Sequence, residues 1–154
     1  MPQTAPFSIR QLTASDVALL RETISMFAAA FDEADTYLGA PPSDAYLEEL
    51  LRGDRLIALA ALRNGAVVGG LAAYELPKFE RERSEIYIYD LAVAAAHRRR
   101  GIATGLIAKL KSVAASRGAH VIFVQADRGD EPAIALYSKL GVREAVLHFD
   151  IEPD

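Results

Sequence analysis

The segment from residue 85 to residue 126 constrains the fold more than any other part of the chain. "EIYIYDLAV", from Glu85 to Val93, is rich in β-branched and aromatic residues and predicts a long central strand. A helix follows a glycine corner and ends at Gly118, and its inner face carries Ile102, Leu106, Leu110 and Val113. The apolar run "VIFVQA" then predicts a buried strand. A strand, a helix and a second strand in this order favour a parallel pair of strands within an α/β fold.

The segments before this unit predict two helices and three strands. "FSIRQL" alternates as a first strand does, and a helix with Val17, Leu20, Ile24, Phe27 and Phe31 on one face follows. We expect a loop at "DEADTYLGAPPSD" and a short helix at 45–51. The strands 56–62 and 66–74 flank the hairpin signal Asn64-Gly65, and a charged loop, "ELPKFERERS", leads to the central strand.

The segments after the unit predict one more helix and one more strand. Pro132 suits the start of a helix through "AIALYSKL", and Gly141 would stop it. "AVLHFDI" is expected to close the chain as a last strand. The whole order predicts a mixed sheet with about four flanking helices.

Length and composition bound the class of protein. The chain has 154 residues, which suits one domain over 1–154, and its net charge of −4 argues against a general nucleic-acid binder. It has no cysteine, and its three histidines lack ligand spacing, so we expect no metal site. Neither a signal pattern nor a membrane-length apolar run is evident, so the expected location is cytoplasmic.

The glycine corner "HRRRGIAT" concentrates positive charge at the start of a helix. The first turn of a helix has unpartnered backbone N–H groups and a partial positive charge, and both favour a phosphate. Gly101 would let the backbone approach a bulky anion, Ala103 keeps the turn small, and Thr104 could add a hydroxyl. Arg98 and Arg99 add charge around it. The corner therefore suits a pyrophosphate, and the alternative is a solvated arginine run.

Two segments resemble the signatures of the GNAT acetyltransferase superfamily. "LAVAAAHRRRGIATGLI" matches the strand-to-helix signature as Arg98-x-x-Gly101-x-Ala103, and "DEPAIALYSKLGV" matches the second signature. In the second signature Asp130 and Val142 stand where asparagine and phenylalanine are common. Further stretches, including "YLGAPPSDAYLEELL", "GGLAAYELPKFE" and "HFDI", resemble the aminoglycoside 3-N-acetyltransferase type I group.

The resemblance implies an acetyl-CoA-dependent enzyme that acetylates the 3-amine of a deoxystreptamine aminoglycoside, an activity associated with antibiotic resistance. It implies a mostly antiparallel, twisted sheet whose central parallel pair splays around the cofactor. The backbone of Leu91 and Val93 would hold the pantetheine arm. The full set of expected cofactor contacts is Leu91, Ala92, Val93, Arg98, Arg99, Arg100, Gly101, Ile102, Ala103, Thr104 and Ala133.

Asp90 and Tyr137 are the candidate catalytic residues. Asp90 is a carboxylate in an otherwise apolar strand, where a charge is costly unless it is used or paired. It would remove the proton of the acceptor's ammonium group, directly or through water, unless it is only a paired structural residue. Tyr137 would, by the resemblance, protonate the leaving thiolate, and the alternative is an aromatic packing residue. Glu85 is the rival base, although we expect it to be exposed.

Acidic residues are the candidates for binding a cationic acceptor. Most surface carboxylates bind nothing, but several cluster in loops near the expected cleft: Asp32, Glu33, Asp35, Glu85, Asp127 and Asp150. Other readings stay open. The acceptor could be a polyamine or a protein amine, or the chain could be a non-catalytic CoA-binding module, and a homodimer is possible in each case. A nucleic-acid role for Arg98 to Arg100 is disfavoured because the chain is acidic.

Overall fold

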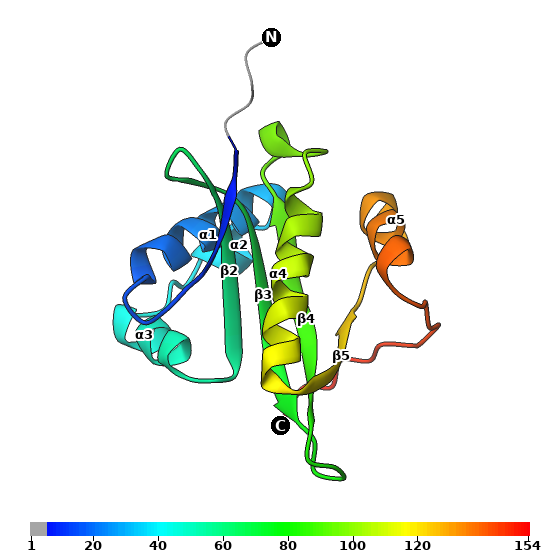
Figure 1. Cartoon of the computed structure of the whole chain (residues 1–154). Helices are drawn as coiled ribbons and strands as arrows, with labels where there is room; N and C mark the ends of the chain where they lie inside the picture. Colours follow the sequence, from blue (N-terminus) through cyan, green and yellow to red (C-terminus); the bar gives the residue numbers. More distant parts are fainter. Residues whose placement is uncertain (1–5) are drawn as a thin grey trace.

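A five-stranded mixed sheet with helices on both faces forms the protein (Figure 1). The structure is a computed structural model that describes residues 6–154. The strands are β1 (Ser8–Gln11), β2 (Leu56–Arg63), β3 (Ala66–Pro77), β4 (Ser84–Val93) and β5 (Ala119–Val124). The helices are α1 (Val17–Phe31), α2 (Ala34–Leu38), α3 (Asp44–Arg52), the 3-10 turn η1 (Ala95–His97), α4 (Ile102–Arg117) and α5 (Glu131–Leu140). This arrangement confirms the predicted mixed α/β class.

The sheet follows the chain order β1-β2-β3-β4-β5. The first three pairings are antiparallel and the pairing of β4 with β5 is parallel. The predicted hairpin between β2 and β3 is confirmed, because Asn64 and Gly65 both have positive φ, at 53° and 79°. Such values are those of the tight turns that match the twist of two strands.

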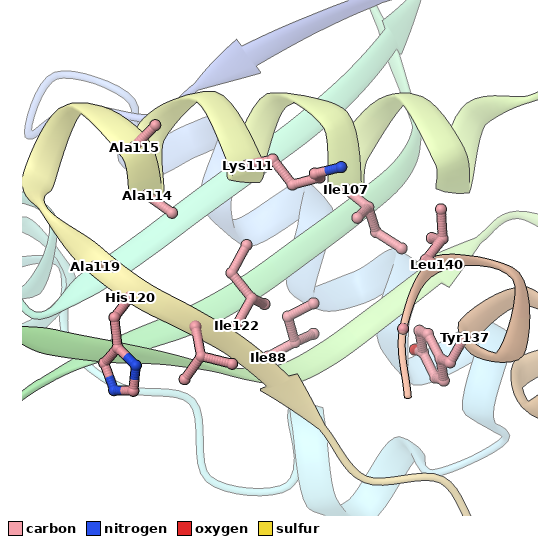
Figure 2. Close-up of a pocket in the computed structure, with 12 residues that line it drawn as sticks. Ile88, Ile107, Lys111, Ala114, Ala115, Ala119, His120, Ile122, Tyr137 and Leu140 are labelled. Atoms are coloured by element: carbon pink, nitrogen blue, oxygen red, sulfur yellow. The ribbon is translucent and has the colours of Figure 1, made fainter. Parts of the chain in front are cut away.

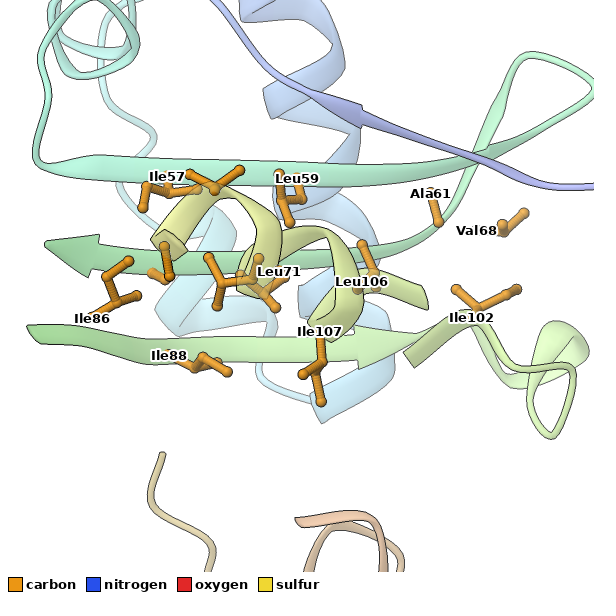
Figure 3. Close-up of a cluster of buried hydrophobic side chains, with 14 residues drawn as sticks. Ile57, Leu59, Ala61, Val68, Leu71, Ile86, Ile88, Ile102, Leu106 and Ile107 are labelled. Carbon is orange, nitrogen blue, oxygen red and sulfur yellow. The ribbon is translucent and has the colours of Figure 1, made fainter. Parts of the chain in front are cut away.

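The hydrophobic core lies on both faces of the sheet. Helix α4 covers one face, where its predicted inner side chains Ile102, Leu106, Leu110 and Val113 are all buried (Figure 3). Helices α1 and α3 cover the other face. The predicted apolar face of α1 is only partly buried. Leu20 and Phe27 are buried, whereas Phe31 is 37% exposed.

Two adjacent glycines of β3 let the helices approach the sheet from opposite sides. A Cβ on Gly69 would lie 2.8 Å from Ile102 Cγ2 on α4. A Cβ on Gly70 would lie 2.6 Å from Thr23 Cγ2 on α1. Both distances are below ordinary van der Waals contact, so glycine sets the helix-to-sheet spacing on each face.

The segment after α5 does not form the predicted last strand. Residues 142–154 have no regular structure and are exposed, including Val142, Val146, Leu147, Phe149 and Ile151. Alternation makes a strand only where a neighbour supplies backbone hydrogen bonds. Helix α5 lies apart from the other helices (Figure 1), and none of its residues is buried. Because α5 lies apart in this way, the segment that follows it forms no backbone pairing with a strand among residues 6–154.

The structure corrects four further expectations. Strand β5 is not buried, since His120 and Val121 are exposed, and the parallel pair lies at an edge of the sheet rather than at its centre. The predicted loop 32–44 contains the helix α2. The charged loop before β4 is shorter than expected, because β3 continues to Pro77 and β4 begins at Ser84.

Asp16 closes the turn between β1 and α1, and we expect its loss to reduce stability. It is 6% exposed, and its carboxylate accepts hydrogen bonds from Arg10 at 2.7 Å and from the Thr13 backbone N–H at 2.8 Å. The Thr13 backbone bond, together with Arg10, lowers the pKa of Asp16. A lowered folded-state pKa stabilises the fold above the unfolded-state pKa, and this contribution is lost as the pH falls through the folded-state value.

We therefore expect Asp16→Ala to lower the free energy of unfolding at neutral pH by about 2 kcal/mol. Chemical denaturation at neutral pH measures this difference, and the deficit should shrink under strongly acidic conditions. Asp44→Ala is the control, because Asp44 also pairs with an arginine, Arg21, but its side chain is 77% exposed. It should cost less than about 1 kcal/mol. Equal losses in the two variants would contradict this account.

Candidate active site

The two parallel strands β4 and β5 separate near Asp90. Their pairing ends where Ile88 meets Val124, whereas β4 continues to Val93. The pairing of β4 with β3 has an irregularity at Tyr89, because Asp90 pairs with Ala72 and Ile88 pairs with Ala73. From Tyr89 onwards, the side of β4 that faced β5 has no strand partner among residues 6–154. In this register Ala92 directs its backbone groups to Gly70 of β3, as Ala94 does to Val68, so along this edge the backbone groups of Leu91 and Val93 point away from β3.

The loop after β4 turns back on itself through the predicted arginines. Arg98 Nε donates a hydrogen bond to the Val93 carbonyl at 3.2 Å, so this carbonyl already has a partner. Arg63 of β2 donates to His97 Nδ1 at 3.0 Å, which anchors the turn η1 to the sheet. Arg98, Arg99 and Arg100 are all exposed, and Arg99 has a positive φ of 62°. The loop therefore presents three cations beside the start of α4.

The N-terminus of α4 carries no side-chain cap. Gly101 occupies the N-cap position with a φ of 79°, and no acidic residue lies in the first turn. An ideal Cβ on Gly101 would meet no protein atom within 4 Å, so the glycine serves the backbone conformation and leaves open space. Ile102 is buried in the core, so only its backbone could reach a ligand, while Thr104 is exposed and Ala103 is half-buried. These features fit an anion.

A groove of about 360 Å³ lies between α4, β5 and α5 (Figure 2). Apolar side chains form most of its wall, among them Ile88, Ile107 and Leu140. Tyr137 lines it from α5, and Lys111 is at its α4 side (Figure 2). The groove passes Ile88, two residues before Asp90, so it approaches the point where β4 and β5 separate.

Tyr137 has the properties of a proton donor. It is half-buried and packs against the core cluster, and its hydroxyl forms no hydrogen bond with another residue in the range 6–154. Burial, and secondly the charge of Asp130, raise the pKa of the Tyr137 hydroxyl, so it is protonated at neutral pH. Asp130 itself caps α5 by accepting from the Ala133 backbone N–H at 3.2 Å. The predicted cofactor contact at Ala133 would therefore have to share or replace this bond.

Asp90 is half-buried and has a tyrosine partner that the sequence analysis missed. The hydroxyl of Tyr37, on α2, donates to Asp90 Oδ1 at 2.8 Å. Burial is the largest influence and raises the pKa of Asp90; the Tyr37 hydrogen bond lowers it, and the nearby charge of Glu33 raises it. Within residues 6–154 no basic side chain forms an ion pair with Asp90. The carboxylate is therefore available to a cation from outside the protein.

The structure brings only some of the predicted acidic residues to Asp90. Glu33 lies close enough to influence its charge, and Asp32 and Asp35 flank Glu33 at the junction of α1 and α2. Glu85 lies at the opposite end of β4, where it faces His120 at 3.3 Å and Lys78 at 3.9 Å. Asp127 follows β5 and is exposed. Asp150, in the unpaired C-terminal segment, faces His148 at 2.9 Å.

No group of three or more histidine or acidic side chains within residues 6–154 is arranged to hold a metal ion. No helix in this range is both long and apolar enough to cross a bilayer.

Comparison with known proteins links this geometry to acetyl transfer. The profile of the Acetyltransferase (GNAT) family matches residues 21–142. An aminoglycoside acetyltransferase from an uncultured soil metagenomic sample is 63% identical, with a TM-score of 0.95 over 97% of this chain and 99% of its own. The comparison with curated proteins found no match.

Two further structures are more distant. A second aminoglycoside acetyltransferase from an uncultured soil metagenomic sample, in complex with sisomicin, is 29% identical with a TM-score of 0.89 and covers 96% of this chain and 97% of its own. A ribosomal-protein-alanine N-acetyltransferase from Brucella melitensis biovar Abortus 2308 is 25% identical with a TM-score of 0.73, over 97% of this chain and all of its own.

Proposed function

Because the chain belongs to the Acetyltransferase (GNAT) family, we propose that it transfers the acetyl group of acetyl-CoA to an amine of an aminoglycoside, the 3-amine of the deoxystreptamine ring. The observation that carries the acceptor class is Asp90. It is a half-buried carboxylate without a basic partner among residues 6–154, and Glu33 adds negative charge nearby. Such a site favours a cation, and an aminoglycoside is polycationic. The similarity to aminoglycoside acetyltransferases supports the same acceptor.

Acetyl-CoA fits the corner at the start of α4. The uncapped N-terminus, the open space at Gly101 and the exposed arginines offer N–H groups and positive charge to a pyrophosphate. The open edge of β4 offers the backbone groups of Leu91 and the N–H of Val93 to the pantetheine arm, while the Val93 carbonyl is held by Arg98. When bound there, acetyl-CoA supplies a thioester whose acetyl group the acceptor amine takes up by direct attack.

The residues of this chain then have separate tasks. Asp90 accepts the proton of the acceptor's ammonium group, directly or through water, and Glu33 with its neighbours attracts the acceptor's other cationic groups. A backbone N–H near Leu91 stabilises the negative charge that develops on the carbonyl oxygen of the thioester. Tyr137 donates its proton to the departing sulfur atom, and the second proton that the acylated nitrogen loses restores the tyrosine through solvent. No nucleophilic side chain is required.

Acetyl-CoA turnover with a panel of amines tests the proposal. Sisomicin, kanamycin and gentamicin should be acetylated, whereas spermidine and a ribosomal-protein peptide with an N-terminal alanine should react much more slowly. Nuclear magnetic resonance of the isolated product should locate the acetyl group on the 3-amine. Acetylation at another ring position would overturn the regiochemistry, and a preference for the polyamine or the peptide would overturn the acceptor class.

Tyr137→Phe should lower kcat by about 10², the low end of general acid catalysis, because water could take over part of the proton transfer. The ring remains, so packing and acetyl-CoA affinity should be kept. Steady-state kinetics at saturating substrates measures the loss. Tyr46→Phe is the matched control, since Tyr46 is 58% exposed. If Tyr137→Phe turns over as fast as the control, Tyr137 is a packing residue only.

A further inference from the structure

We propose that Tyr37 is a positioning residue for the proton-accepting carboxylate of Asp90. No sequence signature indicates this role for Tyr37. Its hydroxyl donates to Asp90 Oδ1 at 2.8 Å across 53 positions of the chain. One oxygen of the carboxylate is thereby held, and Oδ2 is left to face the acceptor amine. The inference rests on the proposed function, because it assumes that Asp90 accepts the proton.

Two stacked phenylalanines of α1 pack against the Tyr37 ring. Its centroid lies 6.1 Å from that of Phe27 and 5.9 Å from that of Phe31, both on α1. Phe27 is only 3% exposed, so this aromatic cluster is anchored in the core. Asp32 ends α1 in the left-handed conformation, with a φ of 53°, and α2, which follows, packs against α1. The hydroxyl therefore reaches Asp90 from a fixed ring.

The surroundings of Asp90 make this hydrogen bond important. The titratable groups that face it are Tyr37 and Glu33 from the junction of α1 and α2, Tyr74 from β3 and the adjacent Tyr89 of β4. Burial and the Glu33 charge both disfavour the ionised carboxylate. The Tyr37 bond favours it, and no other side chain among residues 6–154 donates to Asp90. Burial, the Asp90 bond and nearby charges raise the pKa of Tyr37 itself, so its hydroxyl keeps the proton that it donates.

The Tyr37 hydrogen bond therefore sets the pH range in which the Asp90 carboxylate can act as a base. With the Tyr37 bond in place, Asp90 stays ionised at a lower pH than burial alone would permit. Without the bond, the pKa of Asp90 rises and the carboxylate can rotate away from the amine. A structural role for Tyr37 in packing alone would alter neither the pH profile nor the dependence on Asp90.

Tyr37→Phe tests the inference because it removes the hydroxyl and keeps the ring. We expect the rising limb of the kcat–pH profile to move to higher pH. At pH values below the limb, kcat should fall by about tenfold, the effect of one hydrogen bond to a charged group. At high pH the deficit should narrow to the part that comes from the lost positioning of the carboxylate, and the KM for acetyl-CoA should not change. Tyr46→Phe, the exposed tyrosine control, should leave the profile unchanged.

A double-mutant cycle and a titration separate this inference from the proposed function. In the Asp90→Asn background, Tyr37→Phe should have little further effect, because the hydroxyl acts only through the carboxylate. The carboxyl ¹³C signal of Asp90 should titrate at higher pH in Tyr37→Phe than in the wild type. An unchanged titration, or an equal loss in both backgrounds, would overturn the role of Tyr37. Full activity of Asp90→Asn would instead refute the proposed base, and the ¹³C titration would still decide whether Tyr37 controls the carboxylate.

Discussion

Asp90→Asn should lower kcat for aminoglycoside acetylation by about 10²–10⁴, the usual contribution of a general base. The side chain keeps its size and its place beside Tyr37, but the amide cannot accept the proton of an ammonium group. Acetyl-CoA binding, measured by calorimetry, should stay the same because the N-terminus of α4 is unaltered. Asp44→Asn is the matched control, since Asp44 lies on α3 and pairs with Arg21.

The same prediction specifies how the acetylation rate should depend on pH. Burial raises the pKa of Asp90 above the ordinary value of an aspartate, and a base is active only when it is ionised. The wild-type rate should therefore rise with pH through that raised pKa, and Asp90→Asn should lose this limb.

Three other outcomes would assign Asp90 a different role. If saturating aminoglycoside restores the rate of Asp90→Asn, Asp90 only attracts the cation. If the variant melts early and loses acetyl-CoA binding, Asp90 supports the fold. A folded variant that acetylates kanamycin or gentamicin at the wild-type rate and affinity would refute both the base and the anchor.

Gly101→Glu should weaken acetyl-CoA binding by about 100-fold or more. The new carboxylate would lie at the uncapped start of α4, in the space that no protein atom occupies. Its negative charge would oppose the pyrophosphate, and placing like charges together costs several kcal/mol. Calorimetry measures the loss of affinity, and acetyl-CoA should no longer raise the melting temperature of the variant.

Gly118→Glu is the control for backbone strain. Gly118 caps the other end of α4 with a φ of 74°, and a Cβ there would also meet no protein atom within 4 Å. Both substitutions force a side chain into the left-handed region, which costs roughly 1–2 kcal/mol of stability. Only Gly101→Glu should also lose acetyl-CoA affinity. Equal affinity in the two variants would exclude the corner as the pyrophosphate site.

Local signals in the sequence were enough to predict much of the fold. The Asn64-Gly65 turn, the α4 stripe that begins at Ile102 and the helix end at Gly118 depend on neighbouring residues only, and the structure confirms them. The glycine corner also depends only on neighbouring residues, and the structure places Gly101 at the N-cap with a positive φ, while the binding of an anion there stays a prediction. Asp90 could be singled out because a charge within an apolar strand is unusual.

Long-range contacts decided what the sequence could not. The pairing of Tyr37 with Asp90 joins residues 53 positions apart, on a helix that proline and acidic residues had suggested was a loop. The proximity of Glu33 to Asp90 likewise follows from the packing of α1 against β3 and β4, whereas Glu85 is distant because it lies near the start of the same strand as Asp90. The alternating segment from Ala145 to Ile151 has the pattern of a strand, but no strand among residues 6–154 pairs with it. A side-chain pattern describes which face could be buried, whereas a strand exists only when another strand completes its backbone hydrogen bonds.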